Sequence, residues 1–179
     1  VGMLLHQDAS PHAWLAGTAR SYDLVVTLDD ATSAIYSAFL VDEEGTASSF
    51  RGLREVVAKH GLFCSLYTDR GSHYFFTPET GGKVSKTILT QVGRALKQLG
   101  IQAIAAYSPQ ARGRGERMNE TLQGRLPNEF RLHGIKTKEQ ANRFLKDHYI
   151  AELNKRFAKT PEQPGSAFLP VAPHVDLNL

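Results

Sequence analysis

The chain has 179 residues, of which 41% are hydrophobic and 22% are charged, which is typical of one globular domain with a substantial core. Its one cysteine, Cys64, excludes an intramolecular disulfide framework, and no histidine pairs with it at zinc-finger spacing. No apolar run approaches the length of a membrane span and no cleavable signal opens the chain, so we expect a cytoplasmic protein without a membrane partner.

The net charge of +3 is distributed unevenly along the chain. Residues 1–50 carry one basic and seven acidic side chains, a net charge of −6. Residues 51–100 carry eight basic and three acidic side chains, a net +5, and residues 101–159 carry twelve and six, a net +6. An acidic first part beside a basic remainder favours a polyanionic partner, although a basic surface that is merely solvated has the same composition.

Strand patterns come first in the chain. Residues 3–8 are a short mixed run that ends in an acid, and residues 24–29 and 35–41 are rich in β-branched and aromatic side chains. The polar residues 30–33 predict a hairpin turn between the latter two strands. Helical spacing then begins at residue 46 and continues to residue 60, where Gly61 is expected to stop the helix.

The middle of the chain alternates strand and helix patterns. Residues 62–68 predict a buried strand that delivers Asp69 into a turn, and residues 77–83 predict a glycine-containing loop. A second helix, closed by Gly100, precedes a fifth strand at residues 101–105. The apolar side chains whose spacing predicts this second helix are Ile88, Val92, Leu96 and Leu99.

Helices are predicted in the last third of the chain. A flexible stretch at residues 108–115 leads into a helix over residues 116–131, which Pro127 should kink or divide into two pieces. Residues 137–155 predict a final helix that opens with a capping box at Thr137. The side chains expected on its inward face are Ala141, Phe144, Leu145, His148 and Tyr149.

This order of elements predicts an α/β fold in which helices flank a mixed five-stranded sheet. The first three strands are joined by short connections and should be antiparallel, whereas strands reached through helices should be parallel. The first and fourth strands should lie side by side in the centre of the sheet. One domain then spans residues 1–159, and the proline-rich residues 160–179 form an irregular tail.

Three acids are placed where side chains can converge. Asp8 and Asp69 each end an apolar strand, and Glu116 opens the predicted third helix, so all three carboxylates can reach one edge of the sheet. Two divalent cations would relieve their repulsion and activate water or a 3′-hydroxyl for attack on a phosphodiester. Oxygen ligands favour Mg²⁺ or Mn²⁺ over zinc. Each acid also has an ordinary alternative as a turn, cap or helix-start residue.

Four segments, in this order, resemble the DDE recombinase family of retroviral integrases and insertion-sequence transposases, whose core is ribonuclease H-like. They are LHQDAS at residues 5–10, VTLDDAT at 26–32, YTDRG at 67–71 and SPQARGRGERMN at 108–119, the last being the most specific. The following TLQGR at 121–125 resembles the continuation of the family's helix. The sequence LNKR at 153–156, followed by a Thr-Pro pair at 160–161, resembles the end of such domains.

The resemblance implies a ribonuclease H-like fold and a bacterial DDE-type polynucleotidyl transferase that uses Mg²⁺ or Mn²⁺, two ions in the active complex, to cut and join DNA. Asp8, Asp69 and Glu116 match the family's catalytic, metal-binding acids. Two features depart from the family. The interval of 47 residues between Asp69 and Glu116 is long, with the extra residues expected near Gly81, and Arg70 stands where asparagine is usual.

Side chains around the third acid are expected to hold DNA. Arg112, Arg114 and Arg117 cluster near the glycines and can neutralise phosphates, unless they belong to a solvated mobile loop. Asn119 and Gln123 share a helix face with the catalytic glutamate and are expected to project toward the DNA.

The expected partners are transposon-end and target DNA and further copies of the chain, as a homodimer or a larger oligomer. The chain is expected to be an excised core that lacks the DNA-binding domain of its parent protein. A ribonuclease H-type nuclease is one alternative, which would ordinarily show an additional acid in the cluster. A catalytically silent DNA-binding or assembly module is another. Asp29 and Asp30 are expected to be turn residues, and Glu120 a solvated or DNA-proximal one.

Overall fold

The computed structural model describes residues 1–79, 81–107, 109–172 and 177, without the side chains of residues 109–112 and 114. The strands are β1 (Leu4–His12), β2 (Tyr22–Asp29), β3 (Ile35–Val41), β4 (Ser65–Thr68) and β5 (Gln102–Ala105). The helices are α1 (Thr46–His60), α2 (Gln91–Gln98), α3 (Pro109–Leu132), α4 (Lys138–Phe144) and α5 (Ile150–Phe157), with a π-helical turn, η1 (Leu145–Tyr149), between the last two. None of the described helices is long and apolar enough to cross a membrane.

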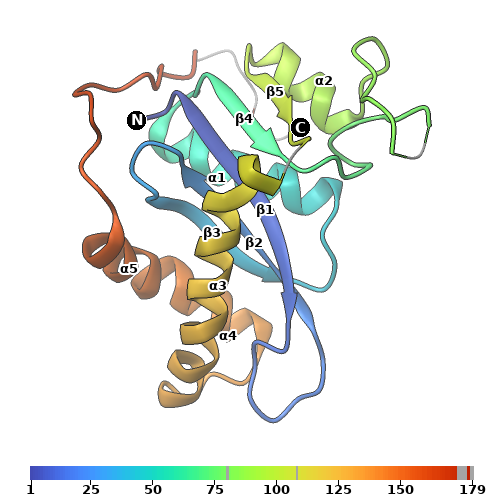
Figure 1. Cartoon of the computed structure of the whole chain (residues 1–179). Coiled ribbons are helices and arrows are strands. Elements are labelled where there is room, and N and C mark those ends of the chain that lie inside the picture. The colour runs from blue at the N-terminus through green and yellow to red at the C-terminus, as the bar shows by residue number, and fades with distance from the viewer. Residues whose placement is uncertain (80, 108, 173–176, 178–179) are drawn as a thin grey trace.

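The strands form one mixed sheet in the order β3-β2-β1-β4-β5 (Figure 1). β1 pairs antiparallel with β2, and β2 with β3, whereas β4 lies parallel to β1 and β5 parallel to β4. This confirms the predicted sheet, with β1 and β4 side by side at its centre. The end of the sheet at which β4 and β5 finish is called the carboxyl end below.

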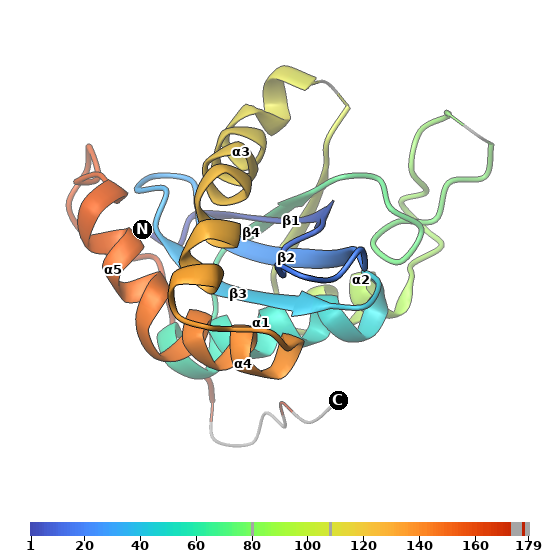
Figure 2. The same cartoon turned by 90° about the horizontal axis from the view of Figure 1, so that it is seen from below.

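Helices cover both faces of the sheet (Figure 2), and an apolar cluster lies on each face. On one face, α1 lies against β2 and β3 and α2 lies against β5, and Val56 and Leu96 belong to one apolar cluster with Leu5 of β1. On the other face, α3 lies against β1, and its fully buried Leu126 and Phe130 belong to the apolar cluster that includes side chains of β2 and β3. The helices therefore hold the central strands from both sides, which fixes the carboxyl end on a rigid scaffold.

The edge strand β3 is covered by side chains of the last two helices. Asn142 of α4 accepts a hydrogen bond from the Leu40 amide at 2.6 Å and donates one to the Leu40 carbonyl at 3.0 Å. Asn154 of α5 binds the amide and carbonyl of Ile35 in the same way, at 2.8 and 2.7 Å. These two asparagines replace the missing neighbouring strand and protect an edge that could otherwise pair with another chain.

α3 differs from its prediction at both ends. It begins at Pro109, so the expected flexible stretch is wrong from residue 109 onward, while Ser108 lies outside the described residues. Proline is favourable in the first turn of a helix, where its missing amide hydrogen is not needed. Pro127 lies inside one continuous helix rather than between two pieces, because the buried Leu126 and Phe130 hold the chain on either side of it.

Smaller corrections concern the other helices. α2 begins at Gln91 behind the N-cap Thr90, whose side chain accepts a hydrogen bond from the Gly93 amide, and Ile88 is 55% exposed ahead of it. The capping box of Thr137 is confirmed. His148 points to solvent rather than inward, because the π-helical turn changes the rotation per residue just where the predicted stripe crosses it.

The described part of the C-terminal tail contains no helix but is attached to the domain. Leu169 forms an antiparallel bridge with Leu62, at the start of the connection to β4. Phe168 packs against the rings of Tyr36 and His60 and against Gly2. The tail thereby joins the N-terminus and the end of α1 at the end of the sheet opposite to the carboxyl end.

Candidate active site

Asp8 lies on β1, and Asp69 directly follows the neighbouring parallel strand β4. The pairing of β1 with β4 matches Leu4 with Ser65 and His6 with Tyr67, and the same register continued by two residues brings Asp8 level with Asp69. Both acids line one small cavity at the carboxyl end, and no lysine or arginine is among its described lining residues. The residues that line it are His6, Gln7, Asp8, Tyr67, Thr68, Asp69 and Gly115.

Asp8 does not end its strand, contrary to the prediction. β1 continues to His12 because residues beyond Asp8 still pair with β2, as in the pair of Ser10 with Leu24. β4 stops at Thr68, so its pairing with β1 has already ended at the level of Asp8. The neighbouring strand is thus missing beside Asp8, which opens the space that the cavity occupies.

Asp69 follows β4 directly, as predicted, and begins a turn. Its Oδ1 atom accepts a hydrogen bond from the Gly71 amide at 2.8 Å. A Cβ atom at Gly71 would lie 3.0 Å from that oxygen and 3.0 Å from the ring of His73, so only glycine fits between them without displacement. The turn therefore holds one oxygen of Asp69 in place.

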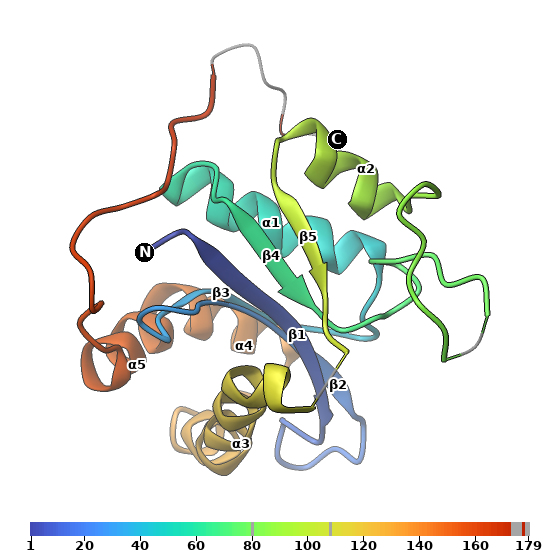
Figure 3. The same cartoon turned by 45° about the horizontal axis from the view of Figure 1, so that its top comes forward.

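α3 lies across β1 beside the cavity (Figure 3). Asn119 donates a hydrogen bond to Oδ2 of Asp8 at 3.2 Å, and Gln123 donates one to the Ser10 hydroxyl at 2.6 Å. Gly115 faces Asp8, since a Cβ atom there would lie 3.6 Å from Oδ2 of Asp8. The spacing of four residues between these positions places all three on one helix face, and this face lies against β1.

Glu116 is exposed and does not line the cavity with Asp8 and Asp69. Within the described part of the chain, no group of three or more His, Cys, Asp or Glu side chains is arranged to hold a metal ion. Glu116 follows Gly115, so its side chain leaves α3 about 100° around the helix from the position that faces Asp8. Arg117 is exposed as well, whereas the side chains of Arg112 and Arg114 lie outside the described residues.

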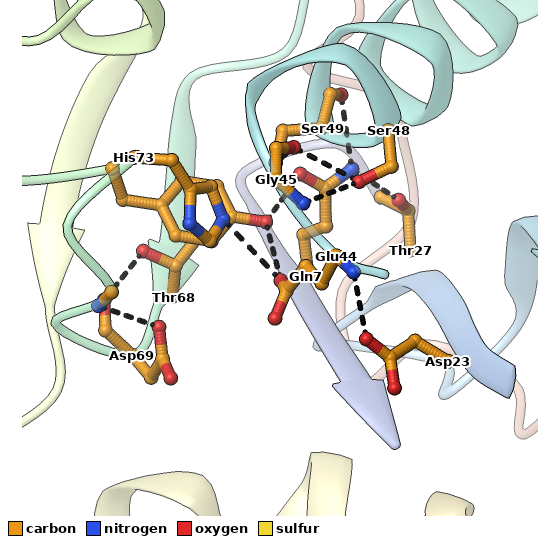
Figure 4. Close-up of polar contacts among 12 residues, drawn as sticks. Gln7, Asp23, Thr27, Glu44, Gly45, Ser48, Ser49, Thr68, Asp69 and His73 are labelled. Atoms are coloured by element: carbon orange, nitrogen blue, oxygen red, sulfur yellow. Dashed lines mark hydrogen bonds and ion pairs between the residues drawn. The ribbon is translucent and has the colours of Figure 1, made fainter. Parts of the chain in front are cut away.

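A buried polar network, missed by the sequence analysis, lies behind the two acids. Gln7, only 1% exposed, accepts a hydrogen bond from the Tyr74 hydroxyl at 2.8 Å and donates one to the Thr27 hydroxyl at 2.9 Å. Its amide is also 3.5 Å from the Ser49 carbonyl oxygen in α1. Figure 4 shows Gln7 with Thr27 and Ser49, and Glu44 nearby. A polar residue inside the apolar run before Asp8 was the signal that could have identified it.

The pKa of the Tyr74 hydroxyl is affected by the acids at this end of the sheet. Burial raises the pKa of Tyr74 well above its usual range, and the carboxylates of Glu44, Asp69 and Asp8 raise it further. The hydroxyl therefore stays protonated and remains a donor to Gln7. Glu44 also approaches the His73 ring at 3.4 Å, so the network reaches the turn that follows Asp69.

The acids of the β2–β3 turn have structural partners. Asp29 is fully buried and accepts hydrogen bonds from the Gly2 amide and from the amide and hydroxyl of Thr32. Asp30 binds His6 at 2.8 Å. Neither acid lines the cavity, in keeping with the expectation that they serve the turn.

Solved structures share this fold. A chain of the simian T-cell lymphotropic virus intasome, in complex with a PP2A regulatory subunit, superposes with a TM-score of 0.61 at 20% identity over 97% of this chain and 59% of that one. The HTLV-2 integrase catalytic core domain in complex with magnesium gives 0.58 at 14% identity over 83% and 87%. The BIV integrase core gives 0.56 at 16% identity over 87% and 95%. The fold is that of an integrase catalytic core, which is ribonuclease H-like, as predicted.

Sequence comparison adds nearer relatives. The chain is 36% identical over 156 residues to the transposase for insertion sequence IS1202 of Streptococcus pneumoniae, covering 87% of this chain and 33% of that protein. It is 34% identical over 170 residues to the putative transposase y4bF of Sinorhizobium fredii, covering 95% and 36%. No family model matches. The chain is a relative of bacterial transposases and spans about a third of their length, which confirms the resemblance found in the sequence.

Proposed function

We propose that this chain is the catalytic core of a DNA transposase, which cuts transposon-end DNA and joins it to target DNA with a divalent metal ion. The observation that carries the proposal is the placement of Asp8 and Asp69, from adjacent parallel strands, around one cavity beside α3. Carboxylate oxygens in a cavity whose described lining contains no lysine or arginine suit Mg²⁺ or Mn²⁺. One related fold, that of HTLV-2 integrase, was solved in complex with magnesium.

The side chains of this chain would bind the metal ions and orient the carboxylates that hold them. Asp8 and Asp69 would hold the metal. The pairing of β1 with β2 fixes the backbone of Asp8, and the Gly71 amide fixes one carboxylate oxygen of Asp69. Asn119 orients one oxygen of Asp8. Two bound ions would supply the Lewis acidity that activates the attacking oxygen and stabilises the leaving one. In the transfer step a 3′-hydroxyl oxygen would bond to a target phosphorus and give its proton to solvent. The phosphorus bond to the target's own 3′ oxygen would break, and that oxygen would take up a proton from solvent to leave as a new 3′-hydroxyl.

Glu116 completes the site as the third acid. It is next to Gly115, which already faces Asp8, so a turn of this part of α3 is enough to exchange one residue for the other. Metal and DNA supply the attraction for that turn. Because catalytic contacts often tighten only in the complex, the exposed position of Glu116 is compatible with this role.

DNA is held by basic side chains around the first turns of α3, with the exposed Arg117 as the described member. Asn119 and Gln123 bind β1 in this structure, and we propose that they contact DNA after α3 has turned. Arg112 and Arg114 are expected to contribute phosphate contacts. The active form is a homo-oligomer, and the HTLV-2 integrase core was solved in dimeric and trimeric forms.

The decisive experiment replaces Glu116 by glutamine in the full-length parent protein. Glutamine keeps the size and helix propensity of glutamate, so the fold should be preserved. It removes the charge that holds a metal ion, so strand transfer should fall by at least about 100-fold, the scale of losing one group of a preorganised electrostatic site. DNA binding, measured by fluorescence anisotropy, should stay nearly unchanged.

Glu120→Gln is the matched control, because Glu120 is exposed one helical turn further along α3. Full activity of this variant beside an inactive Glu116→Gln supports the proposal. The reverse result would show that the third acid has been placed one turn too early. Full activity of both variants would contradict a DDE-type enzyme.

A further inference from the structure

Residues 81–90 lie between β4 and α2, within the interval that is longer than is usual in the family. This segment, called the 81–90 loop below, projects beside the carboxyl end of the sheet (Figure 1). It is tied together by local hydrogen bonds. The Ser85 amide donates to the Phe76 carbonyl at 2.7 Å, and the Ser85 hydroxyl accepts from the Ile88 amide at 2.9 Å.

Arg70 attaches the 81–90 loop to the carboxyl end. Its guanidinium donates a hydrogen bond to the Gly82 carbonyl at 3.0 Å and approaches that of Gly81 at 3.5 Å. The same guanidinium lies over the ring of Tyr107, 5.3 Å from its centroid. Arg70 directly follows Asp69, so the loop is fixed to the residue after a proposed metal ligand.

Tyr107 provides a second attachment from the end of β5. Its hydroxyl oxygen accepts a hydrogen bond from the Val84 amide at 3.0 Å. Arg70 and Tyr107 thus bind successive parts of the 81–90 loop from two adjacent strands. The long interval between Asp69 and Glu116 and the arginine at position 70, which both depart from the family pattern, thus have one explanation. An asparagine at position 70 would be too short to contact both the loop carbonyls and the ring of Tyr107.

The outer surface of the 81–90 loop is basic. Lys83 and Lys86 are exposed, and neither forms an ion pair with any described residue. The loop contains no acid. Lys83 and Lys86 therefore present two exposed positive charges, of the kind that attracts phosphates.

We propose that the 81–90 loop is a DNA-contacting extension of the active site, in which Lys83 and Lys86 bind phosphates and Arg70 is the positioning residue. The inference rests on the proposed function, since the DNA is the substrate held at Asp8 and Asp69. Lysine contacts of this kind add affinity without reading sequence. The proposed DNA-contacting surface thus extends from the basic side chains of α3, past the carboxyl end of the sheet, to the 81–90 loop beside the ends of β4 and β5.

The first test measures binding of a short fluorescent DNA duplex to the chain, in EDTA, over a range of salt concentrations. Each phosphate contact contributes about 0.9 to the slope of log affinity against log salt, so Lys83→Ala/Lys86→Ala should reduce the slope by about 1.8. At about 0.1 M salt the affinity should fall at least about tenfold.

Lys59→Ala/Lys155→Ala is the charge-matched control. Both lysines are exposed, on the last turns of α1 and α5. Both helices end at the opposite end of the sheet, where Lys159 binds the Thr32 carbonyl. An unchanged slope in this control, beside a reduced one in the loop variant, supports the proposal. Equal slopes in all three proteins, or equal reductions in both variants, overturn it.

The second test separates the role of Arg70 from a general effect on the fold. Trypsin cleaves after Lys83 and Lys86, and loss of the guanidinium contacts in Arg70→Ala should accelerate both cleavages about tenfold. Arg70→Lys should be accelerated similarly, because its ammonium keeps the charge but cannot stack and bridge like a guanidinium. The melting temperature should not change. Cleavage rates like those of the wild type would overturn the positioning role.

A third test asks whether bound DNA protects the 81–90 loop from trypsin. A duplex added to the wild-type chain should slow cleavage after Lys83 and Lys86, and unaltered cleavage at saturating DNA would overturn the contact. These readouts use no metal and no strand transfer. If the loop variants behave like wild type while Glu116→Gln is inactive, the proposed function stands and only the loop inference fails.

Discussion

At the scale of single residues, two acids with different supports share one cavity. Asp69 is held by the amide of Gly71, and Asp8 by the side-chain amide of Asn119. Each contact uses one carboxylate oxygen of the acid concerned. Behind them, Gln7 joins β1 to Tyr74 in the turn after Asp69. Rigid supports of this kind determine how well a pair of acids can bind a metal ion.

Replacement of Asp69 by asparagine should weaken Mn²⁺ binding by at least about tenfold, because the amide removes a charged ligand. Its Oδ1 atom can still accept the Gly71 hydrogen bond, so the turn should survive. Isothermal calorimetry measures the affinity. Asp42→Asn is the control, since Asp42 pairs with Arg20 and Lys138 and does not line the cavity. Equal affinities in all three proteins would rule out a metal site at Asp69.

At the scale of elements, the packing of α1 on the sheet depends on the close contact of Gly52 with the side chains of two strands. A Cβ atom at Gly52 would lie 2.4 Å from the Gln7 side-chain nitrogen and 3.2 Å from the Thr27 hydroxyl. Gln7 cannot move away without losing its hydrogen bonds to Thr27 and Tyr74. The network behind the acids and the packing of α1 are therefore one structural unit.

Gly52→Ala should destabilise the protein by about 1–3 kcal/mol, the range for overpacking a filled core. Gly124→Ala is the matched control, because Gly124 lies within α3 and a Cβ atom at this position would point into open space. Alanine there should stabilise the protein by up to about 1 kcal/mol through helix propensity. Urea unfolding measures both effects. A neutral Gly52→Ala would show that the sheet accommodates α1 at a greater separation.

At the scale of the whole molecule, the tail closes the end of the sheet opposite to the carboxyl end. Phe168 lies against His60 and Tyr36, and the ring centroids of the latter two are 4.4 Å apart. The Nε2 atom of His60 is buried without a hydrogen-bond partner among the described residues. Burial and the neighbouring Lys59 lower the pKa of His60 below its usual value of 6.5.

Because the folded state lowers this pKa, the neutral ring of His60 contributes stability that is complete above about pH 6.5 and declines as the pH falls further. Wild-type stability should therefore decrease from about pH 7.5 to about pH 5.5 more than that of His60→Phe, which keeps an aromatic ring without titrating. Urea unfolding at both pH values tests this. Parallel decreases would show that His60 does not sense pH in this cluster.

The order, direction and pairing of the strands could be predicted from the sequence because they depend on local signals. The β-branched and aromatic side chains of residues 24–29 and 35–41, the turn between these strands and the glycine after residue 60 are signals that span only a few neighbouring positions. Asp8 and Asp69 could be placed near each other because the β–α–β connection makes their strands parallel. Residues 5–125 also resembled known recombinases in motif and order.

Only the tertiary structure decided the start of α3, the continuity of α3 at Pro127 and the position of Glu116. Gly113 and Gly115 weaken the local helix signal at the start of α3, and contacts such as that of Asn119 with Asp8 hold the helix there. Gln7, Tyr74 and the attachments of Arg70 are likewise partners separated by many positions in the chain. Local periodicity determines which elements form, whereas contacts across long stretches of sequence exist only after the chain has folded.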